Sequence, residues 1–255
     1  MTVGNIMPIP EDFTPGAGLL DGRVIMITGA SGGLGRALAL DCARAGASVI
    51  LAGRNGAKLD RLYDEITALG APQPAIAAMD LASATAVDYD RLAETIGSEF
   101  GRLDGLVHAA ALLGDRTPLE QYDVPTWCRV LHVNLTAPFI LTQVLLPNLR
   151  RSADASVIFV SSSIVHNPRP YWGAYAVSKT ALEAVRTLLS QELEGEENIR
   201  INSINPGRMR TAMRAVAYPA EDPNTVPNPA SVAAPFLYLL SALGRGIDGE
   251  YFDAQ

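Results

Sequence analysis

The stretch Val24-Ile-Met-Ile-Thr-Gly-Ala-Ser-Gly-Gly-Leu-Gly35 leads from a continuous apolar run into a cluster of glycines, and a helical pattern follows it. An apolar run of this kind predicts a strand that is covered on both faces, as in a parallel sheet. Gly29, Gly33 and Gly35 let the backbone turn tightly and approach a pyrophosphate at the N-terminus of the helix. The stretch therefore predicts a cofactor-binding turn, to which Ser31 and Leu34 also belong.

The rest of the chain continues this alternation of strand and helix. Apolar runs predict further strands at residues 48–52, 75–79, 105–109, 156–160 and 199–204, and more weakly at 250–253. Helical patterns cover residues 33–45, 56–69, 86–100, 124–149, 174–194 and 230–242. We therefore expect an α/β fold: a single-domain, Rossmann-like, doubly wound parallel sheet of about seven strands with helices on both faces.

Composition excludes several other classes of protein. The formal net charge is −7 and no basic patch stands out, which argues against a nucleic acid partner. Residues 1–22 lack a basic segment followed by an apolar core, so we expect no secretory signal and a cytoplasmic location. Cys42 and Cys128 form neither a CxxC motif nor a zinc spacing, and we predict no metal site and two cysteines buried in helices.

One long segment needs a membrane test. Residues 130–149 contain no Lys, Arg, Asp or Glu, but they include several polar residues and two prolines, which argues against a bilayer span. We expect a helix buried on both faces, against the sheet and a second subunit. The helical patterns at 124–149 and 174–194 are both largely uncharged, which predicts a homodimer or homotetramer.

The end of the second predicted strand indicates which cofactor is bound. NAD-binding versions of this fold place a carboxylate here to bind the ribose 2′-hydroxyl, whereas this chain has Gly53 followed by Arg54. A glycine leaves room for a phosphate that a guanidinium can bind in bidentate fashion, so NADP(H) is favoured over NAD(H). A solvated loop arginine is the alternative. Arg36 is a second candidate cation, and Asp80 either accepts a hydrogen bond from adenine or caps a helix.

A second motif, Tyr175-Ala-Val-Ser-Lys179, contains one of only two lysines in the chain. Residues four apart share one face of a helix, so the ammonium lies within reach of the phenol. A nearby positive charge favours the phenolate, which predicts a tyrosine that exchanges protons near neutral pH. The alternative is an ordinary amphipathic helix with a lysine that reaches solvent.

A serine hydrolase is a competing interpretation of the glycine turn. Gly29-x-Ser31-x-Gly33 matches the nucleophile elbow of α/β-hydrolases, which requires an acid and then a histidine downstream. The three histidines are residues 108, 132 and 166, so none lies in the last 89 residues. No HGGG-type loop precedes the serine, and both observations count against this alternative.

Four motifs in order resemble the short-chain dehydrogenase/reductase family: T-G-x-x-x-G-x-G, Asp80-Leu81, Asn134 and Y-x-x-x-K. The resemblance extends from about Arg23 to the C-terminus, which implies a single dinucleotide-binding catalytic domain at 23–255 after an N-terminal arm at 1–22. It implies that Tyr175 is the general acid/base and that Lys179 lowers its pKa and binds the nicotinamide ribose.

The same resemblance assigns roles to further residues. Ser162, 13 residues before the tyrosine, would hold the substrate carbonyl, with Ser161 or Ser163 as alternatives. Asn134 would carry a water of a proton relay, or would only stabilise a helix kink. The cofactor site would also contain Pro206, Gly207 and Thr211 near the nicotinamide, with Asp80, Leu81 and Ala109 near the adenosine.

The chain departs from the family pattern at two places. His108-Ala-Ala-Ala111 replaces the usual Asn-Asn-Ala-Gly, and these alanines could crowd the adenosine ribose. Asp248-Gly-Glu-Tyr-Phe-Asp-Ala-Gln255 replaces the customary Asp-Gly-Gly. With Leu112-Leu-Gly-Asp115, this ending resembles a bacterial subgroup of oxidoreductases whose substrate is not settled.

The sequence therefore predicts an NADP(H)-dependent oxidoreductase that interconverts a carbonyl and an alcohol on an unidentified small molecule. The alternative is an NADP(H)-binding sensor or scaffold with little catalysis. Residues 212–230, with four prolines, predict a semi-rigid substrate lid rather than a helix, or else a plain surface connection. Arg208, Arg210 and Arg214 either attract an anionic substrate or pair with acids of this segment.

Overall fold

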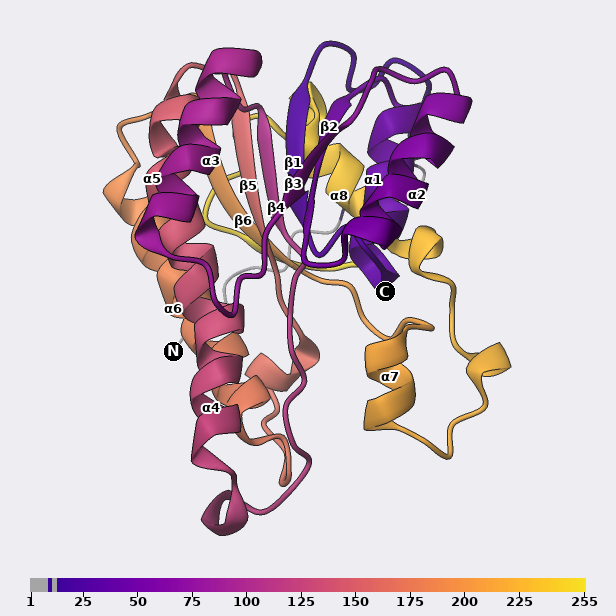
Figure 1. Cartoon of the computed structure of the whole chain (residues 1–255), viewed down its shortest axis with the longest axis vertical. Helices are drawn as coiled ribbons and strands as arrows, with labels where there is room; N and C mark the ends of the chain where they lie inside the picture. The colour runs from indigo at the N-terminus through magenta and orange to yellow at the C-terminus, as the bar shows by residue number, and fades with distance from the viewer. Residues whose placement is uncertain (1–8, 11–12) are drawn as a thin grey trace.

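All seven strands form one parallel sheet in the order β3-β2-β1-β4-β5-β6-β7 in the computed structural model, which describes residues 9–10 and 13–255 (Figure 1). The strands are β1 (Val24–Thr28), β2 (Ser48–Gly53), β3 (Ala75–Ala78), β4 (Gly105–His108), β5 (Ala155–Val160), β6 (Ile199–Asn205) and β7 (Tyr251–Asp253). The predicted fold class is confirmed, and every predicted strand is present. Strand order reverses between β1 and β4, which opens a crevice at their carboxyl ends.

Helices cover both faces of the sheet, with α1, α2 and α8 on one side and α3 to α6 on the other (Figure 1). They are α1 (Gly33–Arg44), α2 (Gly56–Ala68), α3 (Ala86–Glu99), α4 (Val124–Leu131), α5 (Ala137–Arg150), α6 (Gly173–Glu192), α7 (Ala212–Ala217) and α8 (Ala234–Leu240). In β1, Ile25 and Ile27 pack into one core and Val24 and Met26 into the other. Because successive strand residues face opposite sides, continuous apolarity fills both cores.

The N-terminal arm is only partly described, since residues 1–8 and 11–12 lie outside the described part of the chain. Near the end of the arm, Leu20 is fully buried in the core beside α1, and its N–H donates to the carbonyl of Ala45. This end of the arm is therefore part of the packed fold.

The long helix predicted at 124–149 is interrupted by a π-helical turn, η2 (His132–Thr136), between α4 and α5. Pro138 has no N–H to donate to the carbonyl of Asn134 four residues earlier, so regular α-helical bonding fails at this point. The combined span Val124–Arg150 is long and apolar enough to cross a membrane by length and composition alone. In this fold, however, α5 packs its apolar side chains into the core with α3 and α6.

The sequence predicts no helix within residues 212–230, and this prediction is wrong. The helix α7 opens this segment, because the Thr211 hydroxyl caps it by accepting from the N–H of Arg214 at 3.1 Å. Two short 3-10 turns follow, η4 (Pro223–Thr225) and η5 (Pro229–Val232), where the prolines prevent a longer helix.

The two cysteines have different environments. Cys42 is buried in α1 as predicted, whereas Cys128 is exposed on α4, so the prediction that it is buried is wrong. Across the described residues, no group of three or more His, Cys, Asp or Glu side chains is placed to hold a metal ion.

Candidate active site

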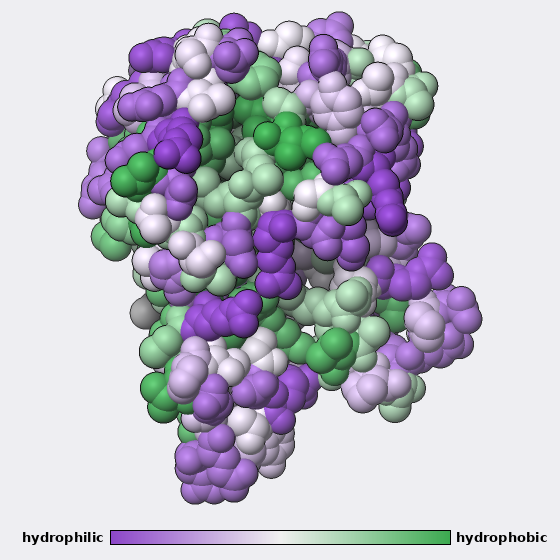
Figure 2. All heavy atoms as spheres, in the orientation of Figure 1, coloured by the Kyte–Doolittle hydropathy of each residue, from purple (hydrophilic) through white to green (hydrophobic). Residues whose placement is uncertain are grey.

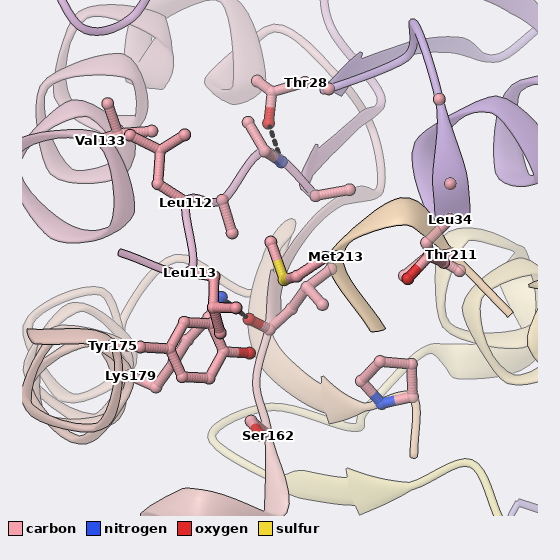
Figure 3. A pocket seen from close by; sticks show the side chains of 18 of the residues that line it. Thr28, Leu34, Leu112, Leu113, Val133, Ser162, Tyr175, Lys179, Thr211 and Met213 are labelled. Atoms are coloured by element: carbon pink, nitrogen blue, oxygen red, sulfur yellow. Dashed lines mark hydrogen bonds between the residues drawn. The ribbon is translucent and has the colours of Figure 1, made fainter. Parts of the chain in front are cut away.

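A cavity of about 800 Å³ opens at the carboxyl ends of the strands. Its walls come from the glycine turn after β1, the loops after β4 and β5, the start of α6, the loop after β6, and α7 (Figure 3). In the space-filling view, hydrophilic and hydrophobic residues both border this part of the surface, between the body of the sheet and α7 (Figure 2). A large pocket at this reversal of strand order is the usual ligand site of an open α/β sheet.

The glycine turn forms one end of the cavity because only glycine fits there. Gly29 has a φ of +70°, and a Cβ on it would lie 2.9 Å from the Cα of Ala110. A Cβ on Gly35 would lie 2.4 Å from the carbonyl oxygen of Gly29. The helix α1 begins without a side-chain cap, so the N–H groups of its first turn are available to an anion. This cradle fits the pyrophosphate of a dinucleotide.

Gly53 and Arg54 continue this end of the cavity at the tip of β2. A Cβ on Gly53 would lie 3.4 Å from the Ser31 hydroxyl, so the glycine keeps space open beside that serine. Within the described residues, the exposed guanidinium of Arg54 makes neither a hydrogen bond nor an ion pair, although it lines the cavity. Arg36, the second candidate cation, instead pairs with Glu65 outside the cavity.

Asp80 and Leu81 lie on the wall next to this end. The Oδ1 atom of Asp80 accepts a hydrogen bond from the N–H of Ala82 at 3.1 Å, which closes the turn after β3. The prediction that Asp80 caps a helix is wrong, because Thr85 caps α3 and Asp80 closes only this turn. Asp80 also borders the cavity.

Tyr175 and Lys179 lie at the start of α6 and form the opposite end of the cavity (Figure 3). Both are buried, with 9% of the tyrosine and 2% of the lysine exposed. The Nζ atom of Lys179 donates to the carbonyl of Val160 at 2.6 Å and lies 5.9 Å from the centroid of the Tyr175 ring.

Burial dominates the protonation of this pair. It raises the pKa of the Tyr175 phenol, and the neighbouring Ser162 hydroxyl acts in the opposite direction. Burial also lowers the pKa of Lys179 to about 8, with the charge of Glu183 opposing the shift. The sequence argument that the lysine lowers the pKa of the phenol is therefore outweighed here, because the ammonium is bonded to a backbone carbonyl and desolvation favours the neutral phenol.

Ser162 follows β5 and precedes the 3-10 turn η3 (Ser163–Val165), which its hydroxyl caps by accepting from the N–H of Ile164 at 3.4 Å. Ser161 and Ser163 line the same cavity. The Ser161 hydroxyl is buried without a hydrogen-bond partner among the described residues, and Ser163 is exposed. Of the three serines, Ser162 is the one that influences the pKa of Tyr175.

Asn134 is not part of the cavity wall. Its side chain is buried, accepts from the N–H of Leu112 at 2.7 Å, and donates to the carbonyl of Leu112 at 2.9 Å and the Ser178 hydroxyl at 3.0 Å. Both amide hydrogens are therefore used. The side chain ties the loop after β4 to α6, and so fixes the helix that carries Tyr175.

The loop after β6 brings Pro206, Gly207 and Thr211 to the cavity. Gly207 has a φ of +72°, and a Cβ on it would lie 2.6 Å from the Gln255 side chain, so glycine is required. The Gln255 amide donates to the carbonyls of Pro206 and Arg208 at 3.1 and 2.8 Å. The ending Asp253-Ala-Gln255, unusual for the resembled family, thus supports the loop after β6.

Ala109, Ala110 and Ala111 line the cavity after β4. The N–H of Ala110 donates to the Thr28 hydroxyl at 3.1 Å, which holds this loop against Gly29. His108 before them is buried: Nε2 bonds Thr142 at 2.9 Å and the ring stacks on Phe159 at 4.8 Å. Burial and the charge of Lys179 lower the pKa of His108 to about 3, so it is neutral at ordinary pH.

The sequence argument missed a set of side chains at the end of the cavity that contains Tyr175. Arg116 donates to the carbonyls of Tyr171 and Ala217, at 3.2 and 2.8 Å, and its guanidinium lies 4.2 Å above the Trp172 ring and 5.8 Å from the Tyr218 ring. It therefore joins three separate segments around the cavity mouth. Nothing local in the sequence indicates this, because the bonds join residues 55 and 101 positions apart.

Ser31 has no catalytic partner of the kind a hydrolase needs. In the described part of the chain, no histidine is hydrogen-bonded to it: His108 is buried beside Thr142, and His166 packs against Tyr251. The serine instead belongs to the wall of the glycine turn.

Comparisons with known proteins agree with this arrangement. The family model described as short chain dehydrogenase matches residues 23–222. The uncharacterized oxidoreductase YciK of Escherichia coli K12 is 42% identical over 243 residues, which cover 95% of this chain and 96% of YciK. A candidate short chain dehydrogenase from Pseudomonas syringae is 49% identical, with a TM-score of 0.94 and coverage of 96% and 99% of the two chains.

A further solved structure contains a cofactor. It is a candidate short chain dehydrogenase of Escherichia coli CFT073 in complex with NADPH, 44% identical, with a TM-score of 0.91 and coverage of 94% of this chain and 100% of that chain. The motif order, the cavity and these matches agree: the chain is an oxidoreductase that belongs to the short-chain dehydrogenase/reductase family.

Proposed function

We propose that the protein is an NADP(H)-dependent oxidoreductase that interconverts a carbonyl and an alcohol on a small molecule. The observation that carries the proposal is one cavity that joins the glycine turn at one end to Ser162, Tyr175 and Lys179 at the other. We assign catalysis to a single dinucleotide-binding domain at 23–255. The end of the cavity that contains Ser162 and Tyr175 is the substrate end, and residues 212–230 are the lid over it.

The unpaired Arg54 supports the choice of NADP(H). Gly53 lies where an NAD-binding site of this fold has a carboxylate and leaves space for a phosphate, and Arg54 follows it directly. The Escherichia coli CFT073 homologue bound to NADPH supports the same choice. The glycine turn, Asp80, Leu81 and Ala109 would hold the adenosine half, and Pro206, Gly207 and Thr211 would hold the nicotinamide half.

The cofactor, when bound, supplies the hydride, and the protein supplies orientation and proton transfer. The Ser162 hydroxyl donates a hydrogen bond to the substrate carbonyl and polarises it. The buried Tyr175 phenol, held neutral by desolvation, donates its proton to the oxygen as negative charge develops there. Lys179 keeps a positive charge beside that proton, fixed by its bond to Val160.

In this proposal, Asn134 acts by holding other groups in position. Because both of its amide hydrogens are bonded to protein, a relay water would have to use its backbone carbonyl, which Pro138 leaves without an α-helical partner. The same bonds hold α6 against the loop after β4, so Asn134 also sets where Tyr175 points.

Assembly and location belong to this proposal too. Phe139 on α5 and Val177 and Leu188 on α6 are 42%, 45% and 56% exposed, and these apolar side chains on two adjacent helices favour a homodimer or homotetramer built on them. The net charge of −7 favours a small-molecule partner over nucleic acid. We assign the protein to the cytoplasm, with no membrane partner.

A sensor or scaffold with little catalysis is less consistent with the site. Ala110 after β4 packs against Gly29 and bonds Thr28, and the cavity beside it remains open. Ser162, Tyr175 and Lys179 all remain at its other end.

The test is the Tyr175→Phe variant, which removes the proton donor and little else. Turnover of carbonyl compounds with NADPH should fall by about a hundred- to ten-thousandfold, because general acid catalysis contributes this much. NADPH affinity, measured by calorimetry, should change little. Turnover equal to that of the unmodified protein would contradict the role of Tyr175, and failure of the unmodified protein to bind NADPH would contradict the proposed function itself.

A further inference from the structure

The charges around the cavity contrast with those of the whole chain. The chain has a formal net charge of −7, yet five cationic residues line the cavity and Asp80 is the one acidic residue among the lining residues. The cationic residues are Arg54, Arg169, Lys179, Arg208 and Arg214. Low-dielectric walls focus the field of such a cluster and attract anions.

The two ends of the cavity account for these charges differently. Arg54 lies at the end formed by β1 to β3, where the phosphates of the cofactor would bind. Arg169 lies in the loop between β5 and α6, the loop that also connects Ser162 to Tyr175. Its charge therefore belongs to the substrate end and is not explained by the cofactor phosphates.

Most arginines at the substrate end already have partners. Arg116 bonds two backbone carbonyls and stacks on Trp172. Arg214 forms a two-bond ion pair with Glu221, at 2.7 and 2.6 Å, and stacks on Tyr218 at 3.8 Å. Arg208 lies close enough to Glu221 to help lower the pKa of that carboxyl.

Arg169 differs from Arg116 and Arg214, which have hydrogen-bond partners, and from Arg208, whose charge acts on Glu221. Its guanidinium forms no hydrogen bond, ion pair or aromatic stack within residues 9–10 and 13–255, although it borders the cavity. An arginine that lines a pocket without a protein partner has its planar donors free for a ligand, and a carboxylate or phosphate matches them in bidentate geometry.

The wall next to the reacting groups is apolar. Tyr175 and Ile164 are buried together, and Leu113, Trp172 and Met213 pack against them from three different segments. Those five side chains all line the cavity (Figure 3). The substrate end therefore combines an apolar wall at the reacting carbon with a free cation on the loop that connects Ser162 to Tyr175.

We propose that the substrate is an anionic carbonyl compound, apolar around its reacting carbon and carrying a carboxylate or phosphate that Arg169 binds. This inference rests on the proposed carbonyl reduction and specifies its substrate class. Arg169 is a specificity-determining residue that contacts the far end of the substrate, and Ser162 and Tyr175 contact the carbonyl.

The test uses two pairs of probes in which a methyl ester removes the negative charge of a carboxylate. An aromatic pair, 4-formylbenzoate and its methyl ester, and an aliphatic pair, 6-oxohexanoate and its methyl ester, are reduced with NADPH, and 4-formylphenyl phosphate serves as the phosphate probe. The kcat/KM of each anion should exceed that of its neutral partner by about tenfold, as expected for one charge-assisted contact. Added salt should lower this preference, because it screens the exposed guanidinium.

Arg169→Gln should remove most of the preference for the anion, mainly through a higher KM, and Arg169→Lys should retain part of it. Arg91→Gln, on the outer face of α3, is the matched control and should keep the preference. Anions and esters that react equally well would overturn the substrate class and leave the carbonyl reduction standing. Reduction of none of these probes by protein that binds NADPH would contradict the carbonyl reduction as well.

Discussion

The two ends of the cavity are built in different ways. The glycine-turn end is made of backbone from consecutive residues, and its shape depends on atoms that glycine lacks at positions 29 and 35. The substrate end is made of side chains from the loop after β4, the loop after β5 and α7, which Arg116 joins. A backbone site cannot change without refolding, whereas a side-chain site can be altered one residue at a time.

The largest loss of cofactor affinity should follow from Gly35→Ala, which adds a side-chain atom at the glycine-turn end of the cavity. The added Cβ would lie 2.4 Å from the carbonyl oxygen of Gly29, and backbone cannot move aside as a flexible side chain does. NADPH affinity measured by calorimetry should fall by at least about a hundredfold, with a lower melting temperature. Gly56→Ala, which meets nothing within 4 Å, is the control, and equal behaviour of both variants would mean that the turn tolerates a Cβ.

Arg54→Asp should have the next largest effect, and it changes a side chain at the same end. The new carboxylate would repel a 2′-phosphate and accept a hydrogen bond from a ribose hydroxyl. The affinity for NADPH should therefore fall about ten- to a hundredfold, and the affinity for NADH should not fall. Titrations with both cofactors measure this. Arg61→Asp on the exposed face of α2 serves as the control. Equal losses for both cofactors would show that Arg54 does not recognise the phosphate.

Arg116→Ala tests the substrate end. The variant loses two hydrogen bonds to backbone carbonyls and the stack on Trp172, and Tyr171 is then less well held at its φ of +69°. The KM for a carbonyl substrate should rise about tenfold while NADPH affinity stays the same. Limited proteolysis should cut faster within residues 212–230. Arg116→Lys keeps the positive charge but lacks the planar donors of the guanidinium, so it should give an intermediate KM.

His108 lies beneath both ends and should affect stability at acid pH rather than substrate or cofactor binding. Its pKa in the folded protein is about 3, so between pH 6.5 and 3 the unfolded chain binds a proton that the folded chain does not. The free energy of unfolding should therefore decrease as pH falls through this window. His108→Asn should make that decrease shallower in denaturant titrations at successive pH values. Parallel curves for the two proteins would contradict a buried, neutral histidine.

The fold and the glycine-turn end could be predicted because their causes are local in the sequence. Continuous apolar runs such as Val24–Thr28 predict strands buried on both faces, and positions that admit only glycine indicate a turn. The spacing of Tyr175 and Lys179 likewise indicates a shared helix face. The π-helical turn at Asn134 and the helix α7 were missed although their causes, Pro138 and the Thr211 cap, are local. The exposure of Cys128 depends on how α4 packs in the fold, which the sequence pattern does not give.

Only the tertiary structure decided how the reacting groups are charged and what surrounds them. Burial raises the pKa of Tyr175 and lowers that of Lys179, opposed by the Ser162 hydroxyl at the phenol and by the charge of Glu183 at the ammonium. Arg116 bonds residues far along the chain and Arg214 bonds Glu221 within residues 212–230, while Arg169 has no such partner among the described residues. The sequence determined the fold, the motif order and the family resemblance, because strand patterns and backbone turns depend on neighbouring residues. The structure decided the electrostatics and the lining of the cavity, because these depend on distances between segments that the sequence separates.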